Sequence, residues 1–107
     1  MFDIVLTEIF KRQFRHLAKK YPSLPKDFSA LLDKIEKEPT FGTSIGDDCF
    51  KIRLAISSKN LGKSGGSRVI THVLFTDNCV RILSIYDKSE KNNLQKNELD
   101  KLKKQKD

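Results

Sequence analysis

The chain has 107 residues, of which 37% are hydrophobic, and this composition suffices for one modest core but not for two domains. Its 21 lysines and arginines outnumber 14 aspartates and glutamates, and the net charge of +7 favours a polyanionic partner such as nucleic acid, the ribosome or an acidic protein. Charged residues interrupt every apolar run that could cross a membrane. We therefore expect one domain over residues 1–107, with no membrane association and a cytoplasmic location.

The N-terminal part predicts a strand followed by a helical hairpin. Residues 2–6 alternate in polarity like a short strand, and Thr7 is a suitable N-cap for the helix that follows. Pro22 ends this first helix, and Pro39 ends a second that starts at Ser23. Each helix has one apolar face, made of Phe10, Phe14, Leu17 and Tyr21 in the first and of Phe28, Leu31, Leu32 and Ile35 in the second.

The C-terminal part predicts three more strands. Residues 40–48 carry two glycines and little periodicity, which indicates a loop. Strands are predicted at 50–56 (FKIRLAI), 69–75 (VITHVLF) and 80–86 (VRILSIY). Leucines are sparse among the lysines of residues 92–107, so we expect a short, poorly anchored helix that frays into a charged tail.

This order of elements predicts an α+β fold. A small antiparallel sheet would combine the N-terminal strand with a three-stranded meander, and the helical hairpin would pack on one face. The other face would be more cationic. Two cysteines without a C-x-x-C motif or a neighbouring histidine pair indicate neither a zinc site nor a disulfide framework, and no cofactor is expected.

Cations and one tyrosine are concentrated between residues 50 and 90. Lys51 and Arg53 alternate with apolar residues, so they project from the same side of their strand, either as a solvated face or as a phosphate site. The segment 59–66 (KNLGKSGG) is either a solvated linker or a phosphate cradle, but it lacks the spacing of a nucleotide-binding P-loop. Tyr86 near a strand end is either a packing aromatic or part of a site.

FKIRLAI, KSGGSRVITHV and IYDKSE, in this order of elements, resemble the RelE/ParE superfamily of type II toxin–antitoxin toxins, and most closely its RelE/HigB-like branch. The resemblance covers nearly the whole chain, and its most specific part is GKSGGSRVIT. It implies a ribosome-dependent, metal-independent endoribonuclease that cleaves messenger RNA in the 30S decoding site. It also implies a cognate antitoxin that holds the toxin inactive.

The resemblance also implies which residues form the site. The two cations before the loop correspond to Lys51 and Arg53, and the arginine after the loop corresponds to Arg68. An aromatic residue and a lysine at the end of the last strand correspond to Tyr86 and Lys88. Further phosphate contacts are assigned to Arg81, Lys59 and Lys63, of which Arg81 is the weakest because it shares strand parity with Leu83 and Ile85.

This set of residues suits cleavage by the neighbouring ribose hydroxyl. A base removes the 2′-hydroxyl proton, cations stabilise the charge that grows on the phosphorane, and an acid protonates the leaving 5′-oxygen. Lys51 is the candidate base because two nearby arginines disfavour its protonated form. Tyr86 or Lys88 is then the acid, or a platform on which a base stacks.

Two other functions remain open from the sequence. One is a ParE-like inhibitor that binds DNA gyrase without nuclease chemistry. The other is a degenerate relative that only binds an antitoxin or RNA, because RelE-type toxins often carry an arginine and a tyrosine where this chain has Ser89 and Gln95. The clustered cations favour the nuclease.

Overall fold

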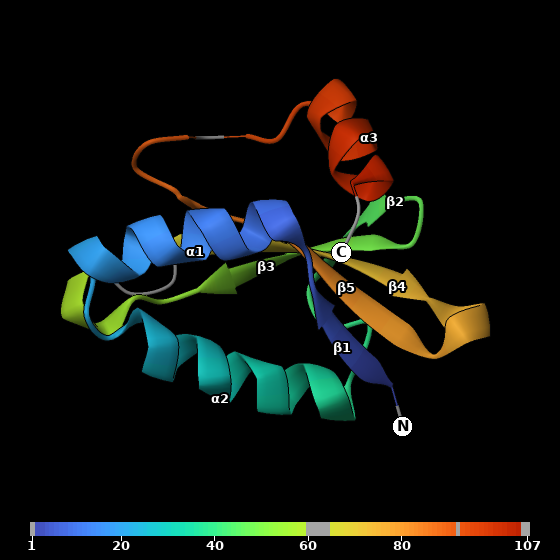
Figure 1. The fold of residues 1–107 in the computed structure, drawn as a ribbon, viewed down its shortest axis with the longest axis horizontal. Helices are drawn as coiled ribbons and strands as arrows, with labels where there is room; N and C mark the ends of the chain where they lie inside the picture. The colour runs from blue at the N-terminus through green and yellow to red at the C-terminus, as the bar shows by residue number, and fades with distance from the viewer. Residues whose placement is uncertain (1, 60–64, 92, 106–107) are drawn as a thin grey trace.

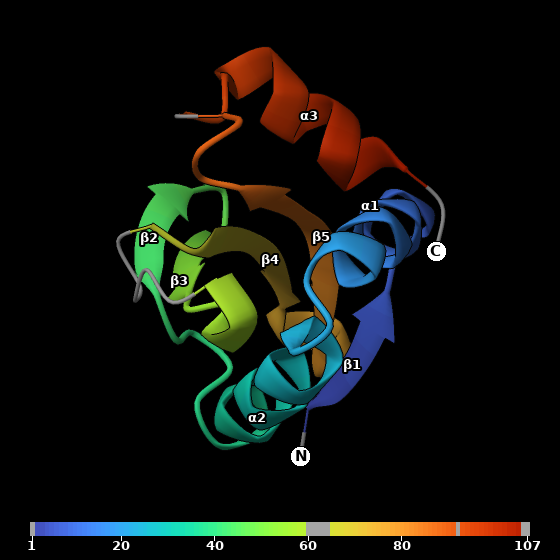
Figure 2. The ribbon, with the colours of Figure 1, turned by 90° about the vertical axis from the view of Figure 1, so that its left-hand side faces the viewer.

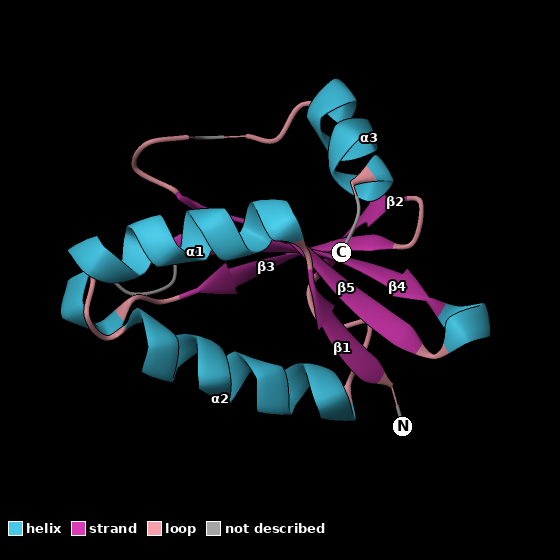
Figure 3. Cartoon of the chain, viewed as in Figure 1, coloured by secondary structure: helices cyan, strands magenta, loops and turns pink. Residues whose placement is uncertain are grey.

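The computed structural model describes residues 2–59, 65–91 and 93–105. Its helices are α1 (Glu8–Lys20), α2 (Leu24–Lys37) and α3 (Lys96–Lys104), with 3₁₀ turns at η1 (Ser57–Lys59) and η2 (Phe75–Asp77). Its strands are β1 (Asp3–Leu6), β2 (Thr43–Gly46), β3 (Cys49–Leu54), β4 (Ser67–Leu74) and β5 (Cys79–Asp87). In this part of the chain the strands form one sheet in the order β1-β5-β4-β3-β2 (Figures 1 and 3).

Helices lie on both sides of the sheet. α2 and α3 lie on opposite sides, while α1 runs along β5 near the β1 edge (Figure 2). Side chains of α1 and α2 pack with one sheet face in a cluster that includes Phe10, Leu24, Ile35, Ile52, Val69 and Ile85. On the other face, Leu99 and Leu102 of α3 pack against Cys49, Ile70, Leu83 and Tyr86. The central strand β4 is covered on both faces, as its apolar sequence predicts.

The predicted helical hairpin is confirmed. Thr7 is the N-cap of α1: its hydroxyl accepts from the Phe10 amide and donates to the Ile82 carbonyl, 2.8 Å away. The cap therefore also fixes the helix start to β5. α1 ends at Lys20, just before Pro22, and α2 carries Pro25 in its first turn, where a missing amide hydrogen costs nothing.

The sheet is mixed, whereas the sequence predicts an antiparallel one. β1 pairs in parallel with β5, with Asp3 opposite Cys79 and Leu6 opposite Ile82. The remaining neighbours are antiparallel. Alternating polarity indicates which side of a strand is buried, but not whether the strand runs parallel or antiparallel to its neighbour. The parallel pairing of β1 with β5 is therefore determined only by the three-dimensional path of the hairpin.

The prediction of a loop over residues 40–48 is partly wrong, because β2 pairs with β3 in that segment. Asp47 and Asp48 connect the strands, both with positive φ (54° and 59°), the conformation that two-residue hairpins require. Gly42 has φ 112°, and a Cβ there would lie 2.8 Å from the Lys51 carbonyl oxygen. A glycine at this position therefore lets the chain pass close to β3.

α3 is better anchored than its lysine-rich composition predicts. Leu99 and Leu102 are 6% and 7% exposed. Glu98 and Gln95 form a capping box at its start, and the Lys103 ammonium lies 2.9 Å from the Asp47 carboxylate. The helix therefore joins the core, and the described part of the tail is ordered by contacts with the sheet and the β2–β3 turn.

Candidate functional site

Strand register brings Lys51, Arg53, Arg68 and Tyr86 onto one face of the sheet. Arg53 lies opposite Arg68 across β3 and β4, and Arg68 lies opposite Tyr86 across β4 and β5. Residues directly opposite each other in a sheet project to the same side, and Lys51 shares the parity of Arg53. We call these four residues the basic face. It lies on the same side of the sheet as α3.

Arg68 is the buried member of the basic face, with 5% of its surface exposed. Its Nη1 donates to the Ser67 carbonyl at 3.2 Å. Burial and the neighbouring Arg53 guanidinium lower its pKa, and Tyr86 opposes this effect. A bound anion would oppose both effects, because a negative charge beside a guanidinium raises its pKa.

Lys51 and Arg53 are more accessible, and neither forms an ion pair within the described residues. Lys51 borders a groove of about 500 Å³ between the β2–β3 hairpin and the start of α3. Arg53 borders another, of about 620 Å³, between α2 and the end of β3. Lys51 therefore borders a groove on the α3 side, whereas Arg53 lies beyond the pairing of β2 with β3, at an edge that also borders the α2 side.

Tyr86 is 8% exposed, and its hydroxyl has no hydrogen-bond partner within the described residues. Its ring packs under α3, and the Lys91 ammonium lies 5.7 Å from the ring centroid. Burial raises the pKa of the phenol, Arg68 lowers it, and Glu98 raises it, with a net upward shift. The phenol therefore keeps its proton at neutral pH and is suited to the role of a donor.

Lys88 follows the end of β5, beside the C-terminal stem of the 59–66 segment. Its backbone amide donates to the Gly66 carbonyl at 3.0 Å, and its side chain is half-buried. The chain around Lys88 is thus tied to the residues that lead into Arg68. In the chain, Lys88 comes two residues after Tyr86 and directly after the end of β5.

Arg81 lies apart from the other predicted cations. A register shift leaves Ile70 opposite Ser84 but Thr71 opposite Ile82, which turns Arg81 toward α3, opposite His72. The Arg81 guanidinium donates to the carbonyls at the end of α3, to Lys103 at 2.9 Å and to Gln105 at 2.6 Å. These contacts stabilise the helix end, where carbonyl groups lack partners.

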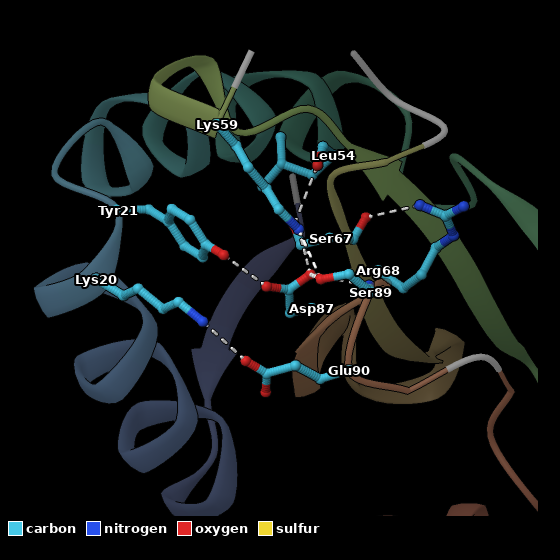
Figure 4. A network of polar contacts seen from close by, with 9 residues as sticks. All are labelled: Lys20, Tyr21, Leu54, Lys59, Ser67, Arg68, Asp87, Ser89 and Glu90. Carbon is cyan, nitrogen blue, oxygen red and sulfur yellow. Dashed lines mark hydrogen bonds and ion pairs between the residues drawn. The ribbon is translucent and has the colours of Figure 1, made fainter. Parts of the chain in front are cut away.

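Lys59 contacts a carboxylate rather than open solvent. Its ammonium forms an ion pair with Asp87 and donates to the Ser89 hydroxyl at 3.0 Å, and 10% of its side chain is exposed (Figure 4). Lys63 lies outside the described residues. Asp87 is not among the site residues that the sequence predicts, although the Asp-x-Ser pattern signals the observed bond from the Ser89 amide to the Asp87 carboxylate.

Histidines and acidic residues do not form a metal centre in the described part of the chain, where His, Cys, Asp and Glu nowhere gather in a group suited to a metal ion. His16 is exposed on α1, while His72 is half-buried, and burial with Arg81 and Lys103 nearby lowers its pKa. Within these same residues, helices long and apolar enough to span a bilayer are absent.

Comparison with known proteins identifies the fold. Neither a protein-family model nor a curated protein sequence matches the chain. Among solved structures, a mutant of the E. coli toxin RelE in the free state has a TM-score of 0.62 at 18% identity, covering 83% of this chain and 85% of that one.

Two further structures agree. The intact E. coli RelBE toxin–antitoxin complex matches with a TM-score of 0.62 at 18% identity, over 81% of this chain and 96% of that one. The isolated E. coli RelE toxin gives 0.62 at 16% identity, over 96% and 97%. The resemblance inferred from the sequence is thus confirmed at the level of architecture, and the chain has the α+β fold of the RelE toxin.

Proposed function

We propose that this chain is the toxin of a type II toxin–antitoxin system and cleaves messenger RNA on the ribosome. The observation that carries the proposal is the alignment of Arg53, Arg68 and Tyr86 across neighbouring strands of a RelE-like fold. Arginines placed directly opposite each other repel, so their juxtaposition favours a site that an anion occupies. A phosphodiester is an anion that two guanidinium groups can grip through paired donors.

The proposed chemistry uses the residues of the basic face together with Lys88. Lys51 would take the proton of the 2′-hydroxyl, while Arg53 and Arg68 would stabilise the phosphorane. Tyr86 or Lys88 would protonate the leaving 5′-oxygen. The phenol is protonated at neutral pH and so has a proton to donate, and Arg68 opposes the upward shift that burial gives its pKa. Every step in this scheme is carried by side chains of the protein.

An antitoxin partner follows from the same proposal. One structural neighbour is a toxin–antitoxin complex, and this chain carries a net charge of +7. We expect a cognate protein of neutral to acidic charge, with a segment that covers the basic face. Co-expression with the product of an adjacent small gene, followed by co-purification, tests this expectation directly.

The decisive test of nuclease function is 5′-end mapping of a reporter messenger RNA in a bacterial translation extract. The wild type is compared with Lys51→Gln/Arg68→Gln, and with a matched control, Lys26→Gln/Lys37→Gln, which removes two exposed cations from α2. A parallel reaction blocks ribosome loading. We expect in-frame cleavage that requires loaded ribosomes, falls at least roughly 100-fold in the first variant and persists in the control.

Intact message with the wild-type protein would refute the proposal. A DNA gyrase supercoiling assay on the same preparation would then test for a gyrase inhibitor. Thermal denaturation of both variants accompanies the cleavage assay, because Arg68 is buried and its replacement can also lower stability.

A further inference from the structure

A buried carboxylate lies next to the basic face. Asp87 is the last residue of β5, and its side chain is 0% exposed. Its Oδ2 accepts from the Tyr21 hydroxyl at 2.9 Å. Its Oδ1 accepts from Lys59, from the Ser89 amide at 2.9 Å and from the Ser89 hydroxyl at 2.7 Å. Removing a carboxylate from water costs free energy, so the hydrogen bonds from these donors must compensate for the lost hydration.

The donors come from separate parts of the fold. Tyr21 is at the end of α1, Lys59 ends η1 after β3, and Ser89 lies in the turn after β5; Figure 4 shows all of them converging on Asp87. The Lys59 ammonium also lies 5.4 Å from the centroid of the Tyr21 ring. We call these four residues the Asp87 clamp. It ties three segments to the end of the strand that carries Tyr86.

The opposite charges of Lys59 and Asp87 favour a structural role for Lys59. Burial alone would raise the pKa of Asp87, but hydrogen bonds from Lys59, Ser89 and Tyr21 outweigh it and hold the pKa well below its usual range. The carboxylate is therefore ionised at neutral pH, and its charge cancels that of Lys59. A buried pair of this kind adds little net stability and is better suited to fixing geometry.

The clamp sits between residues of the proposed site. Asp87 lies opposite Ser67, the neighbour of Arg68, and it separates Tyr86 from Lys88 in the chain. The Lys88 amide bonds to the Gly66 carbonyl on the adjoining stem. A shift of Asp87 would therefore move both candidate acids relative to Arg68.

We propose that Asp87 is a positioning residue, whose clamp on Tyr21, Lys59 and Ser89 fixes Tyr86 and Lys88 against Arg68. It acts through these residues and does not itself contact the RNA. The inference rests on the proposed nuclease function for its kinetic consequence. Its structural consequence, order at the end of β5, can be measured without any cleavage.

The test removes both charges of the pair at once. Lys59→Met/Asp87→Asn leaves no buried unpaired ion and does not change the net charge. The matched control is Lys20→Met/Glu90→Gln, which removes an exposed ion pair, 3.2 Å long, that also joins the end of α1 to the turn after β5. Both variants are assayed for cleavage, for binding to ribosomes loaded with a 2′-deoxy-substituted RNA that resists cleavage, and for amide hydrogen exchange.

In the clamp variant we expect kcat to fall at least about 10-fold, because misplaced catalytic groups lower the rate more than they weaken binding. The KM and the affinity for ribosomes loaded with the uncleavable RNA should stay within about 2-fold. Exchange of the Lys88 amide should accelerate at least about 10-fold, while that of Val69 in the sheet centre stays unchanged. The control should match the wild type in every readout.

A folded clamp variant with wild-type kcat, or with unchanged exchange at Lys88, would overturn the inference. A wild-type protein that does not cleave refutes the proposed function instead, and exchange at Lys88 then decides alone whether the clamp orders this region. If the double variant does not fold, Tyr21→Phe replaces it, because it removes one neutral donor from Oδ2. That variant should lower kcat about 3-fold and accelerate exchange at Lys88, and wild-type values in both would overturn the inference.

Discussion

Arg53 and Arg68 lie directly opposite each other on β3 and β4, the first exposed and the second 5% exposed. Like charges in opposed positions of an antiparallel pair destabilise a sheet. The burial of one guanidinium beside the other should therefore lower stability, a cost that the proposed phosphate site would explain. The proposed site thus carries a measurable cost in the free energy of folding.

Replacement of Arg53 should separate these two effects. Arg53→Gln removes the repulsion, and we expect the free energy of unfolding to rise by about 0.5 kcal/mol at low salt. The gain should disappear at roughly 0.5 M salt, where exposed charges are screened. Urea denaturation at both salt concentrations measures the change, and cleavage should fall at least about 10-fold. A loss of stability at low salt would contradict the repulsion.

Acid should destabilise the fold partly through Asp87. Its pKa is lower in the folded state than in the unfolded state, so its contribution to stability is complete above the unfolded value of about 3.9. That contribution is lost progressively as the pH falls below about 4 toward the folded value. Urea denaturation from pH 6 to pH 2 should show a shallower pH dependence in Lys59→Met/Asp87→Asn than in the wild type. Parallel curves would show that Asp87 does not contribute.

The end of α3 should depend on Arg81. Arg81→Ala removes donors to the carbonyls of Lys103 and Gln105, and we expect the free energy of unfolding to fall by about 2 kcal/mol. Arg12→Ala, on the exposed face of α1, is the control and should change it by less than about 0.5 kcal/mol. Urea denaturation compares the two. An equal effect of both substitutions would argue against the capping role.

The cysteines should differ in reactivity. Cys49 is fully buried, and burial raises the pKa of its thiol to about 11. Cys79 is half-exposed at the start of β5. Labelling with a chromogenic disulfide at pH 8 should modify Cys49 roughly 100-fold more slowly than Cys79, because the thiolate is the reactive form. The difference should vanish in 6 M urea, and fast labelling of both in native buffer would be inconsistent with the burial of Cys49.

Local patterns in the sequence predict the helices and most strands well. The hairpin of α1 and α2 follows from apolar spacing, Thr7 and the prolines. The sequence does not predict β2, because its turn uses Asp47-Asp48 instead of the usual Asn-Gly or Asp-Gly. The pairing of β1 with β5 depends on the path of the intervening chain, which local patterns do not encode.

The candidate site was only partly predictable for the same reason. The alternation of Lys51 and Arg53 is local, so their common side follows from the sequence. The register that places Arg68 opposite Tyr86 is not local. The register shift between β4 and β5 adds one residue to β5, and it thereby changes the side of the sheet on which Arg81 lies. The contacts of Asp87 with Tyr21 and Lys59 join residues 66 and 28 positions apart, beyond the reach of any periodicity.

The parallel pairing of β1 with β5 has a consequence for biosynthesis. β1 has no strand partner until Ile82 has left the ribosome, and contacts of such long sequence separation form slowly. β5 also carries Tyr86, which lies opposite Arg68 on β4. A nascent chain can therefore build its helical hairpin early but completes the basic face only when β5 has emerged, so the proposed phosphate site does not exist in the partly made protein.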